Sequence, residues 1–303
     1  MALDSSLNAK DRILIVAVMY QRAPHESSSI CSLAQIFKTC PALASRFALV
    51  IFDNSPQSHR VMIDFDFPVL YKHDPANPGL AGAYNFALKV AEEGGSQWLL
   101  LLDQDTSLIR EFILELIKSV DSLIGRSDVA SIVPKLLVNG IIFSPAAHFI
   151  EQLRHQYKRS NHAVVPETVG VQQRRLFAYN SGSAHRVSAL RAIGGFPQDF
   201  WLDYLDHAVF HSLHNCGYRV YVMHTRIPHD ASLARASSVP LWRHRNILAA
   251  QTCFVKKTGT AFDRLLHRIW LLRWSRSLWI DNVDKQFCKE VATQAFRGRL
   301  VPK

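Results

Sequence analysis

Long apolar runs separated by amphipathic stretches dominate the first third of the chain. The runs at residues 12–20, 47–53 and 98–102 have the length and composition of strands that are buried on both faces. Between them, residues 28–40 and 77–94 place apolar side chains at helical spacing. This alternation of strand and helix predicts an α/β fold with a mostly parallel central sheet flanked by helices.

The pattern continues less regularly after residue 107. A helix is predicted over 108–120, a strand over 129–137, and a helix ending near Gly217 that is followed by a further strand. Residues 139–176 follow no clear period and are predicted to form a loop or a hairpin.

Acidic side chains follow two of the apolar runs. Asp53 comes directly after the second run, where it also fits an ordinary turn, and Asp103 and Asp105 follow the run at 98–102. Ligands of parallel sheets collect at the carboxyl ends of the strands, so two acidic ends indicate a site. Two carboxylates this close repel each other unless a cation lies between them. Mg²⁺ or Mn²⁺, which take oxygen ligands and share them with phosphates, would meet that need.

Composition narrows the class of protein. The 303 residues are 48% apolar and carry a formal charge of +10, which favours an anionic partner such as a nucleotide, a nucleic acid or a lipid surface. No nucleic-acid motif accompanies the charge, so we expect no nucleic-acid partner. Five cysteines without CxxC spacing, no apolar leader and no apolar run of about 18 residues predict a cytoplasmic protein without a membrane span.

Five motifs in a fixed order carry a resemblance to a known family. They are VIFDNSP, NPGLAGAYNFAL, LLLDQDTSL, YNSGSAHR and FWLDYLDHAVFHSLHNCGYRV. Together they resemble the family 2 inverting glycosyltransferases, close to the rhamnosyltransferase-like branch, over about residues 12–250. The resemblance implies a GT-A fold over 1–232, with a nucleotide-sugar part (about 12–107) and an acceptor part (about 108–232). Residues 233–303 would form a basic helical extension.

The resemblance also implies roles for the donor-side residues. Asp53 would accept a hydrogen bond from a pyrimidine base, and Asp103 and Asp105 would form the Mg²⁺ or Mn²⁺ motif, with Asp103 nearer the ribose. His229 would be a third metal ligand, although in a chain with 14 histidines it also fits a surface position. Four residues would lie along the nucleoside: Asn77, Gly79, Gly82 and Asn85. Glycine there permits close backbone approach.

Inverting transfer needs one general base that takes a proton from the acceptor hydroxyl. Asp206 matches the position of the base in the family, and Asp203 is the alternative. We expect one of the two to catalyse and the other to cap the following helix. The family commonly has an acid and an arginine where this chain has Ala208 and Ser212.

A basic stretch follows the catalytic motifs. Arg243 and Arg245, with Asn246, match a family stretch that would bind the donor diphosphate or an anionic acceptor lipid, and they also fit solvated cations at the start of a helix. The implied reaction moves a sugar, with L-rhamnose from dTDP-L-rhamnose as the model case, from a dTDP or UDP donor. Its acceptor would be a saccharide or lipid-linked glycan of a bacterial surface polysaccharide.

Residues 263–280 interleave arginines with leucines and tryptophans. As a helix, this segment fits either an amphipathic helix on an anionic membrane or a helix packed on the catalytic domain. The first alternative would place the protein at the inner face of the cell membrane as a peripheral protein.

Two other functions remain open from the sequence. A strand followed by Asp-x-Asp also begins the haloacid-dehalogenase-like phosphatases, in which Asp103 would be the nucleophile, although that motif normally follows the first strand of its domain. The departures at Ala208 and Ser212 would also fit a non-catalytic relative that binds a glycan or a membrane.

Overall fold

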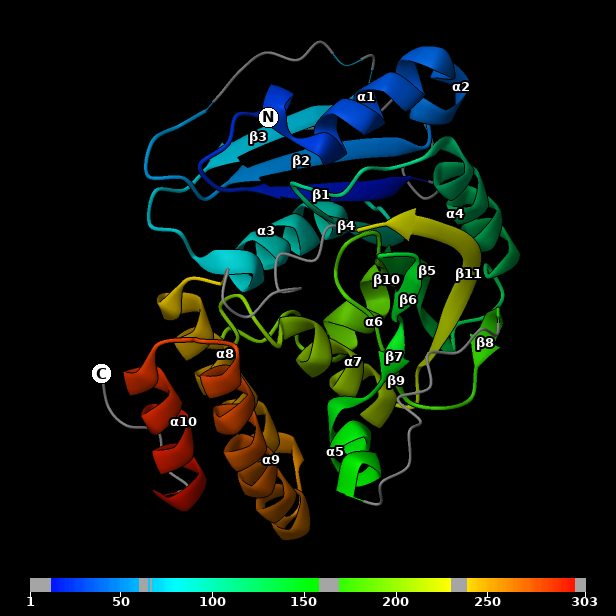
Figure 1. Ribbon diagram of the computed structural model, residues 1–303. Coiled ribbons are helices and arrows are strands. Elements are labelled where there is room, and N and C mark those ends of the chain that lie inside the picture. The colour runs from blue at the N-terminus through cyan, green and yellow to red at the C-terminus, as the bar shows by residue number, and fades with distance from the viewer. Residues whose placement is uncertain (1–11, 60–64, 66, 158–168, 230–238, 298–303) are drawn as a thin grey trace.

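A computed structural model describes residues 12–59, 65, 67–157, 169–229 and 239–297 of the chain (Figure 1). The strands are β1 (Ile13–Met19), β2 (Phe47–Asp53), β3 (Val69–His73), β4 (Trp98–Asp103), β5 (Val129–Val138), β6 (Ile141–Ser144), β7 (Ala146–Ala147), β8 (Gly170–Gln172), β9 (Leu176–Phe177), β10 (Ala184–Arg186) and β11 (Arg219–Pro228). The helices are η2 (Pro24–Glu26), α1 (Ser28–Thr39), α2 (Pro41–Ala44), α3 (Gly79–Glu93), α4 (Arg110–Ser122), α5 (Phe149–Tyr157), α6 (Val187–Ala192), α7 (Leu205–Asn215), α8 (Leu241–Thr258), α9 (Ala261–Ile280) and α10 (Lys285–Arg297).

The central sheet has the order β3-β2-β1-β4-β10-β5-β11-β8, and β6 pairs with β5. The strands β1 to β4 pair in parallel, as the sequence predicts, and β5 pairs in parallel with β11. The short strand β10 lies antiparallel between β4 and β5. The expected α/β fold is confirmed, with parallel pairing in the first half and a mixed sheet overall.

Strand β1 shows why this sequence forms a three-layer structure. Its even-numbered residues, such as Val16, pack against α3, α6 and α7, whereas its odd-numbered residues, such as Ile15, pack against α1 and α4. All seven residues of β1 are buried. Each buried aliphatic side chain stabilises the fold by about 1.5–3 kcal/mol, so a continuous apolar run is favoured only where both faces are covered.

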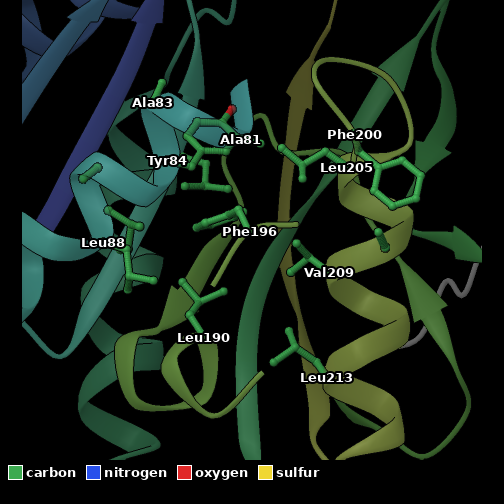
Figure 2. Packing of buried hydrophobic residues seen from close by; sticks show 14 of the residues in the cluster. Ala81, Ala83, Tyr84, Leu88, Leu190, Phe196, Phe200, Leu205, Val209 and Leu213 are labelled. Carbon is green, nitrogen blue, oxygen red and sulfur yellow. The ribbon is translucent and has the colours of Figure 1, made fainter. Parts of the chain in front are cut away.

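Helix α3 meets α6 and α7 in one apolar cluster beside the sheet. Figure 2 shows Tyr84 and Leu88 of α3 facing Leu190 and Phe196, with Val209 of α7 alongside. The rings of Tyr84 and Phe196 have centroids 5.1 Å apart. This packing fixes the position of α3 relative to α7, and both helices contribute to the site described below.

Residues 139–176, which lack a clear period, form more regular structure than a single loop. Strand β6 makes a hairpin with β5, and helix α5 lies in the chain between β7 and β9, which pair as a small second sheet. Residues 158–168 of this segment lie outside the described residues.

The C-terminal helical part is present as expected. Helices α8, α9 and α10 lie side by side (Figure 1) and share a small apolar core that includes Leu248, Leu271 and Phe287. Helix α9 covers the predicted helical segment 263–280 and also contacts α5. It therefore packs on the protein along one side, while Leu265, Trp279 and other apolar residues on its opposite side are exposed.

Two further expectations concern this region. The predicted boundary between residues 232 and 233 lies outside the described residues. Among the described helices, none combines the length and the apolar character that crossing a bilayer requires.

Candidate active site

The acidic strand ends lie at one edge of the sheet. In the register of β1, Met19 is opposite Asp53 on β2 and Val18 is opposite Asp103 on β4. Because β2 and β4 flank β1, two strand spacings separate the two acids, roughly 10 Å. The predicted convergence of Asp53 and Asp103 at this edge is what parallel pairing produces.

Asp53 is 1% exposed and already has three donors. The amides of Ser55 (2.9 Å) and His59 (3.0 Å) and the Tyr71 hydroxyl (2.6 Å) donate to its carboxylate. Burial alone would raise the pKa of Asp53, but the hydrogen bonds from Ser55, Tyr71 and His59 outweigh it and lower the pKa. These donors occupy most of the roughly four acceptor positions of the carboxylate.

Gly79 and Gly82, which are predicted to lie along a nucleoside, lie close to other protein atoms in the structure. Gly79 has a φ of +72°, and a Cβ there would lie 2.2 Å from the carbonyl oxygen of Trp201. The indole Nε1 of Trp201 donates to the carbonyl of Asn77 (2.9 Å), so this loop and the start of α3 are in direct contact. A Cβ at Gly82 would lie 2.3 Å from Cβ of Pro78.

Asn85 also has partners within the chain. Its side-chain amide donates to the Phe196 carbonyl (2.7 Å) and its Oδ1 accepts from the Phe196 amide (2.8 Å). This pair joins α3 to the segment after α6. The structure therefore places Asn85 in a tertiary contact between elements of the site.

Serine hydroxyls hold the end of β4 and the loop that follows it, which carry Asp103 and Asp105. Two of the serines lie at the start of α1 and one lies before β10. The hydroxyl of Ser27 donates to the carbonyl of Gln104 (2.8 Å), and that of Ser29 donates to the Asp103 carbonyl. The hydroxyl of Ser181, in the turn before β10, donates to the Asp103 carboxylate. Because β10 pairs antiparallel with β4, the sequence YNSGS is brought directly beside this loop.

The predicted metal residues lie within electrostatic reach of one another. Burial raises the pKa of Asp103, and the charge of Asp105 raises it further, while Ser181, His229 and Arg243 act in the opposite direction. Nδ1 of His229 is buried without a hydrogen-bond partner. Two repelling carboxylates and one unpartnered imidazole nitrogen are a donor set that fits Mg²⁺ or Mn²⁺. Within the described residues, no three acidic, histidine or cysteine side chains are already arranged as a metal site.

Asp206 lies in the first turn of α7 and is 7% exposed. Burial raises its pKa to about 7, and the charges of Asp203 and Asp103 add to the shift, whereas the amide of His207 opposes it. Tyr84 of α3 is buried close to both acids: burial, and then the charges of Asp103 and Asp206, raise its pKa well above the usual value. The strand end and α7 thus bring two acids into one buried site beside Tyr84.

Asp203 has a different environment. Its carboxylate accepts from the side-chain amide of Asn246 (2.6 Å) and from the Arg243 guanidinium (3.4 Å), both on α8. The prediction that one of these acids caps α7 is wrong. The N-cap residue is Tyr204, in the left-handed region with φ of 64°, and no side chain caps the helix. The chain turns sharply enough at Tyr204 to direct Asp203 to α8 instead.

The two predicted diphosphate residues separate in the structure. Arg243 lies at Asp203 and within electrostatic reach of Asp103. Arg245 makes a two-point salt bridge with Glu290 of α10, at 3.0 and 2.7 Å. The guanidinium of Arg245 therefore joins α8 to α10. The structure does not bring Arg245 together with Asp103, Asp203 and Asp206.

Several residues of the site were not predicted as site residues. Ser181 lies within a quoted motif, and it is identified only through its contact to Asp103, which is distant in sequence. Asn246 belongs to the predicted basic stretch, but its contact to Asp203 was not predicted. Tyr84 and Trp201 fit ordinary core or surface positions in the sequence. Tyr179 is buried near Asp206 and Asp203, and burial together with the charges of these two acids raises its pKa well above the usual value.

Comparison with known proteins identifies one family. Residues 32–184, about half of the chain, match the family described as Glycosyl transferase family 2. No match is found among the curated proteins.

Solved structures share the fold at low sequence identity. GalNAc-T7 with UDP, GalNAc and Mn²⁺ is similar with a TM-score of 0.57 at 14% identity, over 99% of this chain and 60% of that one. The S. aureus TarS 1-349 structure in complex with UDP is similar with a TM-score of 0.51 at 13% identity, over 94% of this chain and 81% of that one. The architecture is therefore a GT-A fold.

Proposed function

This chain belongs to glycosyl transferase family 2, and we propose that it transfers a sugar from a nucleotide-sugar donor to an acceptor hydroxyl with inversion at the anomeric carbon. The observation that carries the proposal is the burial of Asp206 within electrostatic reach of Asp103 at the end of β4. A single displacement requires a base and a donor-binding group in one site.

The donor proposed is a UDP or dTDP sugar. UDP is named in the structures of both fold neighbours, and GalNAc-T7 also carries Mn²⁺. We propose L-rhamnose, from dTDP-L-rhamnose, as the sugar because the ordered motifs resemble the rhamnosyltransferase-like branch. The acceptor would be a saccharide or lipid-linked glycan in the synthesis of a bacterial surface polysaccharide.

In the proposed reaction, Asp206 accepts the proton of the acceptor hydroxyl as the oxygen attacks the anomeric carbon. The bond from that carbon to the nucleoside diphosphate breaks, and the proton remains on the Asp206 carboxyl group. A pKa of about 7 suits this role, because a general base is most effective when its pKa lies near the working pH. Asp203 is less suited, since Asn246 and Arg243 already hold its carboxylate.

Asp103, Asp105 and His229 would hold Mg²⁺ or Mn²⁺ in the proposed enzyme. When bound, the ion would supply positive charge that stabilises the departing diphosphate. Arg243 adds a cation at the same site, and its salt bridge to Asp203 holds it there. Ser181 orients the Asp103 carboxylate, and Asp53 with Asn77 would bound the nucleoside side of the site.

The test separates donor binding from chemistry. We expect UDP or dTDP with Mn²⁺ to raise the melting temperature of the wild-type protein, and sugar nucleotides to release their nucleotide when acceptors are added. Asp206→Asn should lower turnover by about 10²- to 10⁴-fold while nucleotide binding is retained. Asp199→Asn is the matched control, because Asp199 is about half-exposed and pairs with Lys257. Turnover of Asp206→Asn at the wild-type rate would refute the assignment.

The departures at Ala208 and Ser212 do not by themselves favour a non-catalytic relative. Ala208 is 6% exposed and packs in the apolar cluster shared by α3 and α7, where an acid would be costly to bury. The family match likewise gives no support to a phosphatase that uses Asp103 as its nucleophile, and Asp103 follows the fourth strand rather than the first.

We propose the GT-A domain over residues 1–232 and the basic extension over 233–303 as working units, with the protein acting in the cytoplasm. Helix α9 exposes apolar side chains between arginines, which supports a peripheral contact of residues 263–280 with the inner face of the cell membrane.

A further inference from the structure

We propose that a cavity between α8, α9 and α10 binds the phosphate group of an anionic lipid. The cavity has a volume of about 220 Å³. This is smaller than the range of about 300–1,000 Å³ that holds whole drug-sized ligands, so the space suits one compact head group. Its polar lining residues are Thr252, Lys256, Arg264, His267, Arg268 and Gln294.

Two side chains lining the cavity have hydrogen-bonding groups without protein partners. Gln294 of α10 is 3% exposed, and its Nε2 has no hydrogen-bond partner. The hydroxyl of Thr252 on α8 is also buried and unpartnered. Buried polar groups in native proteins are nearly always satisfied, so two such groups lining one cavity indicate a ligand that accepts hydrogen bonds.

The charges at this cavity favour an anion. Lys256, Arg264 and Arg268 line it, and no acidic residue is among its lining residues. Arg264 also donates to the carbonyl of Lys256 (3.0 Å), which joins α9 to α8 at the cavity. Arginine and lysine beside neutral donors are the usual environment of a bound phosphate.

Apolar side chains beside the cavity favour a lipid as the source of that phosphate. Leu265 and Leu272 lie three residues before and four residues after Arg268 on α9, and such spacings place side chains on the same helix face. They are 53% and 40% exposed. A head group in the cavity would leave its acyl chains beside these leucines, whereas a free phosphate would make no use of them.

The cavity is separate from the proposed active site. Arg243 lies in the first turn of α8, and Thr252 lies nine residues later, about 14 Å along the helix axis. The inference deepens the proposed membrane contact but does not depend on glycosyl transfer, because lipid binding and nucleotide binding are measured independently.

Vesicle flotation of the full-length protein tests the proposal. We expect binding to vesicles of phosphatidylcholine with phosphatidic acid, and little binding to vesicles of phosphatidylcholine alone. Inorganic phosphate should compete weakly, because it lacks the apolar contact. Binding of inorganic phosphate without binding to the anionic vesicles would overturn the proposal, and so would equal binding to both kinds of vesicle.

Variants without a charge change separate the cavity from general attraction to a negative surface. Gln294→Met and Thr252→Val remove the unpartnered groups and keep similar volume. Each should weaken binding to the anionic vesicles by about tenfold, as expected for losing a hydrogen bond to a charged group. The melting temperature without lipid should stay level or rise, because each variant removes a buried unsatisfied group. Unchanged vesicle binding in both folded variants would overturn the proposal.

A charge-matched pair gives the second control. Arg264→Gln with Arg268→Gln removes two cations from the cavity, and Arg273→Gln with Arg276→Gln removes two exposed cations from the same helix outside it. The cavity pair should lose much more affinity than the control pair. Equal losses would show attraction without a site and would overturn the proposal, while nucleotide binding reports on the active site separately.

Discussion

The hydroxyl of Ser181 donates to the carboxylate of Asp103 although the two residues are 78 positions apart in the chain. The bond exists because β10 runs antiparallel beside β4 and returns the preceding turn to the acidic loop. This hydrogen bond favours the ionised form of Asp103. Burial and the charge of Asp105 act in the opposite direction and favour its neutral form.

Ser181→Ala should therefore weaken Mn²⁺-dependent nucleotide binding. Without the hydroxyl, Asp103 holds a proton more readily, and the proton competes with the metal ion. We expect a loss of about tenfold that becomes larger as the pH is lowered, measured by calorimetry at two pH values. Ser122→Ala, on the far end of α4, should leave binding unchanged. A loss that does not vary with pH would contradict this reason.

The pH dependence of turnover should report Asp206. A general base acts only when deprotonated, and the pKa of Asp206 is raised to about 7 by burial and by the nearby acids. The rate at limiting donor should therefore be low at pH 5.5, rise through about pH 7 and level off above pH 8. Asp206→Asn should abolish this rise. A profile already flat from pH 5.5 to 8 would contradict the role of Asp206.

The raised pKa of Asp206 also affects the stability of the fold. Stability is favoured at low pH, whereas turnover is favoured at high pH. Between the unfolded pKa of about 3.9 and the folded value of about 7, the folded state holds a proton that the unfolded state has lost. The stabilisation from Asp206 is thus present at low pH and is lost as the pH rises from about 4 to 7. Asp206→Asn removes the buried charge and should stabilise the protein at pH 8 by about 2–4 kcal/mol. Urea unfolding at pH 8 measures the difference, and a destabilised variant would contradict the prediction.

Sequence patterns predicted the first half of the fold for a clear physical reason. A strand such as β1, buried on both faces, must be apolar throughout, and parallel pairing then places Asp53 and Asp103 at one edge. These features depend on short-range periodicity and on the direction of the strands.

Contacts between distant segments could not be predicted in the same way. Asn85 fits a helix facing a ligand, yet its amide is paired with the backbone of Phe196, 111 residues away. The capping role expected of Asp203 or Asp206 fails because Tyr204 adopts a left-handed conformation, which neighbouring residue types do not indicate. Arg245 is held by Glu290, a partner known only once α8 and α10 are packed together.

The salt bridge between Arg154 and Asp263 should stabilise the contact of α5 with α9. Its two hydrogen bonds measure 2.7 and 2.8 Å, and Asp263 also accepts from Thr260 at the start of α9. Asp263→Ala should cost roughly 1–3 kcal/mol, less than a fully buried pair because Arg154 is partly exposed.

The pH dependence of the stability lost in Asp263→Ala shows whether the ionised carboxylate of Asp263 is its cause. The hydrogen bonds from Arg154, opposed by burial, lower the pKa of Asp263 to about 2, so its contribution is present above the unfolded pKa of about 3.9 and is lost as the pH falls toward 2. Denaturant unfolding at pH 7 measures the effect. Asp281→Ala, at the exposed other end of α9, should cost little, and equal losses in the two variants would contradict the prediction.

Buried histidines should make the protein sensitive to acid. Burial lowers the pKa of His148 to about 2, of His185 and His207 to about 3, and of His267 to about 4. Stability from these neutral rings is present above the unfolded pKa of about 6.5 and is lost as the pH falls below it. Four such groups outweigh the opposite effect of Asp206. Far-ultraviolet dichroism should show unfolding between about pH 4 and 5.5, and an intact fold at pH 3.5 would contradict the prediction.

The indole of Trp201 joins two segments that the proposed reaction assigns to different substrates. It contacts Gly79 and donates to Asn77, where the donor is proposed to bind, while its own loop leads to Asp203 and Asp206. Any shift of this loop would therefore also move the indole relative to Asn77 and Gly79. If the proposed sites are correct, binding of the two substrates should therefore be coupled, which initial-velocity and product-inhibition patterns would display.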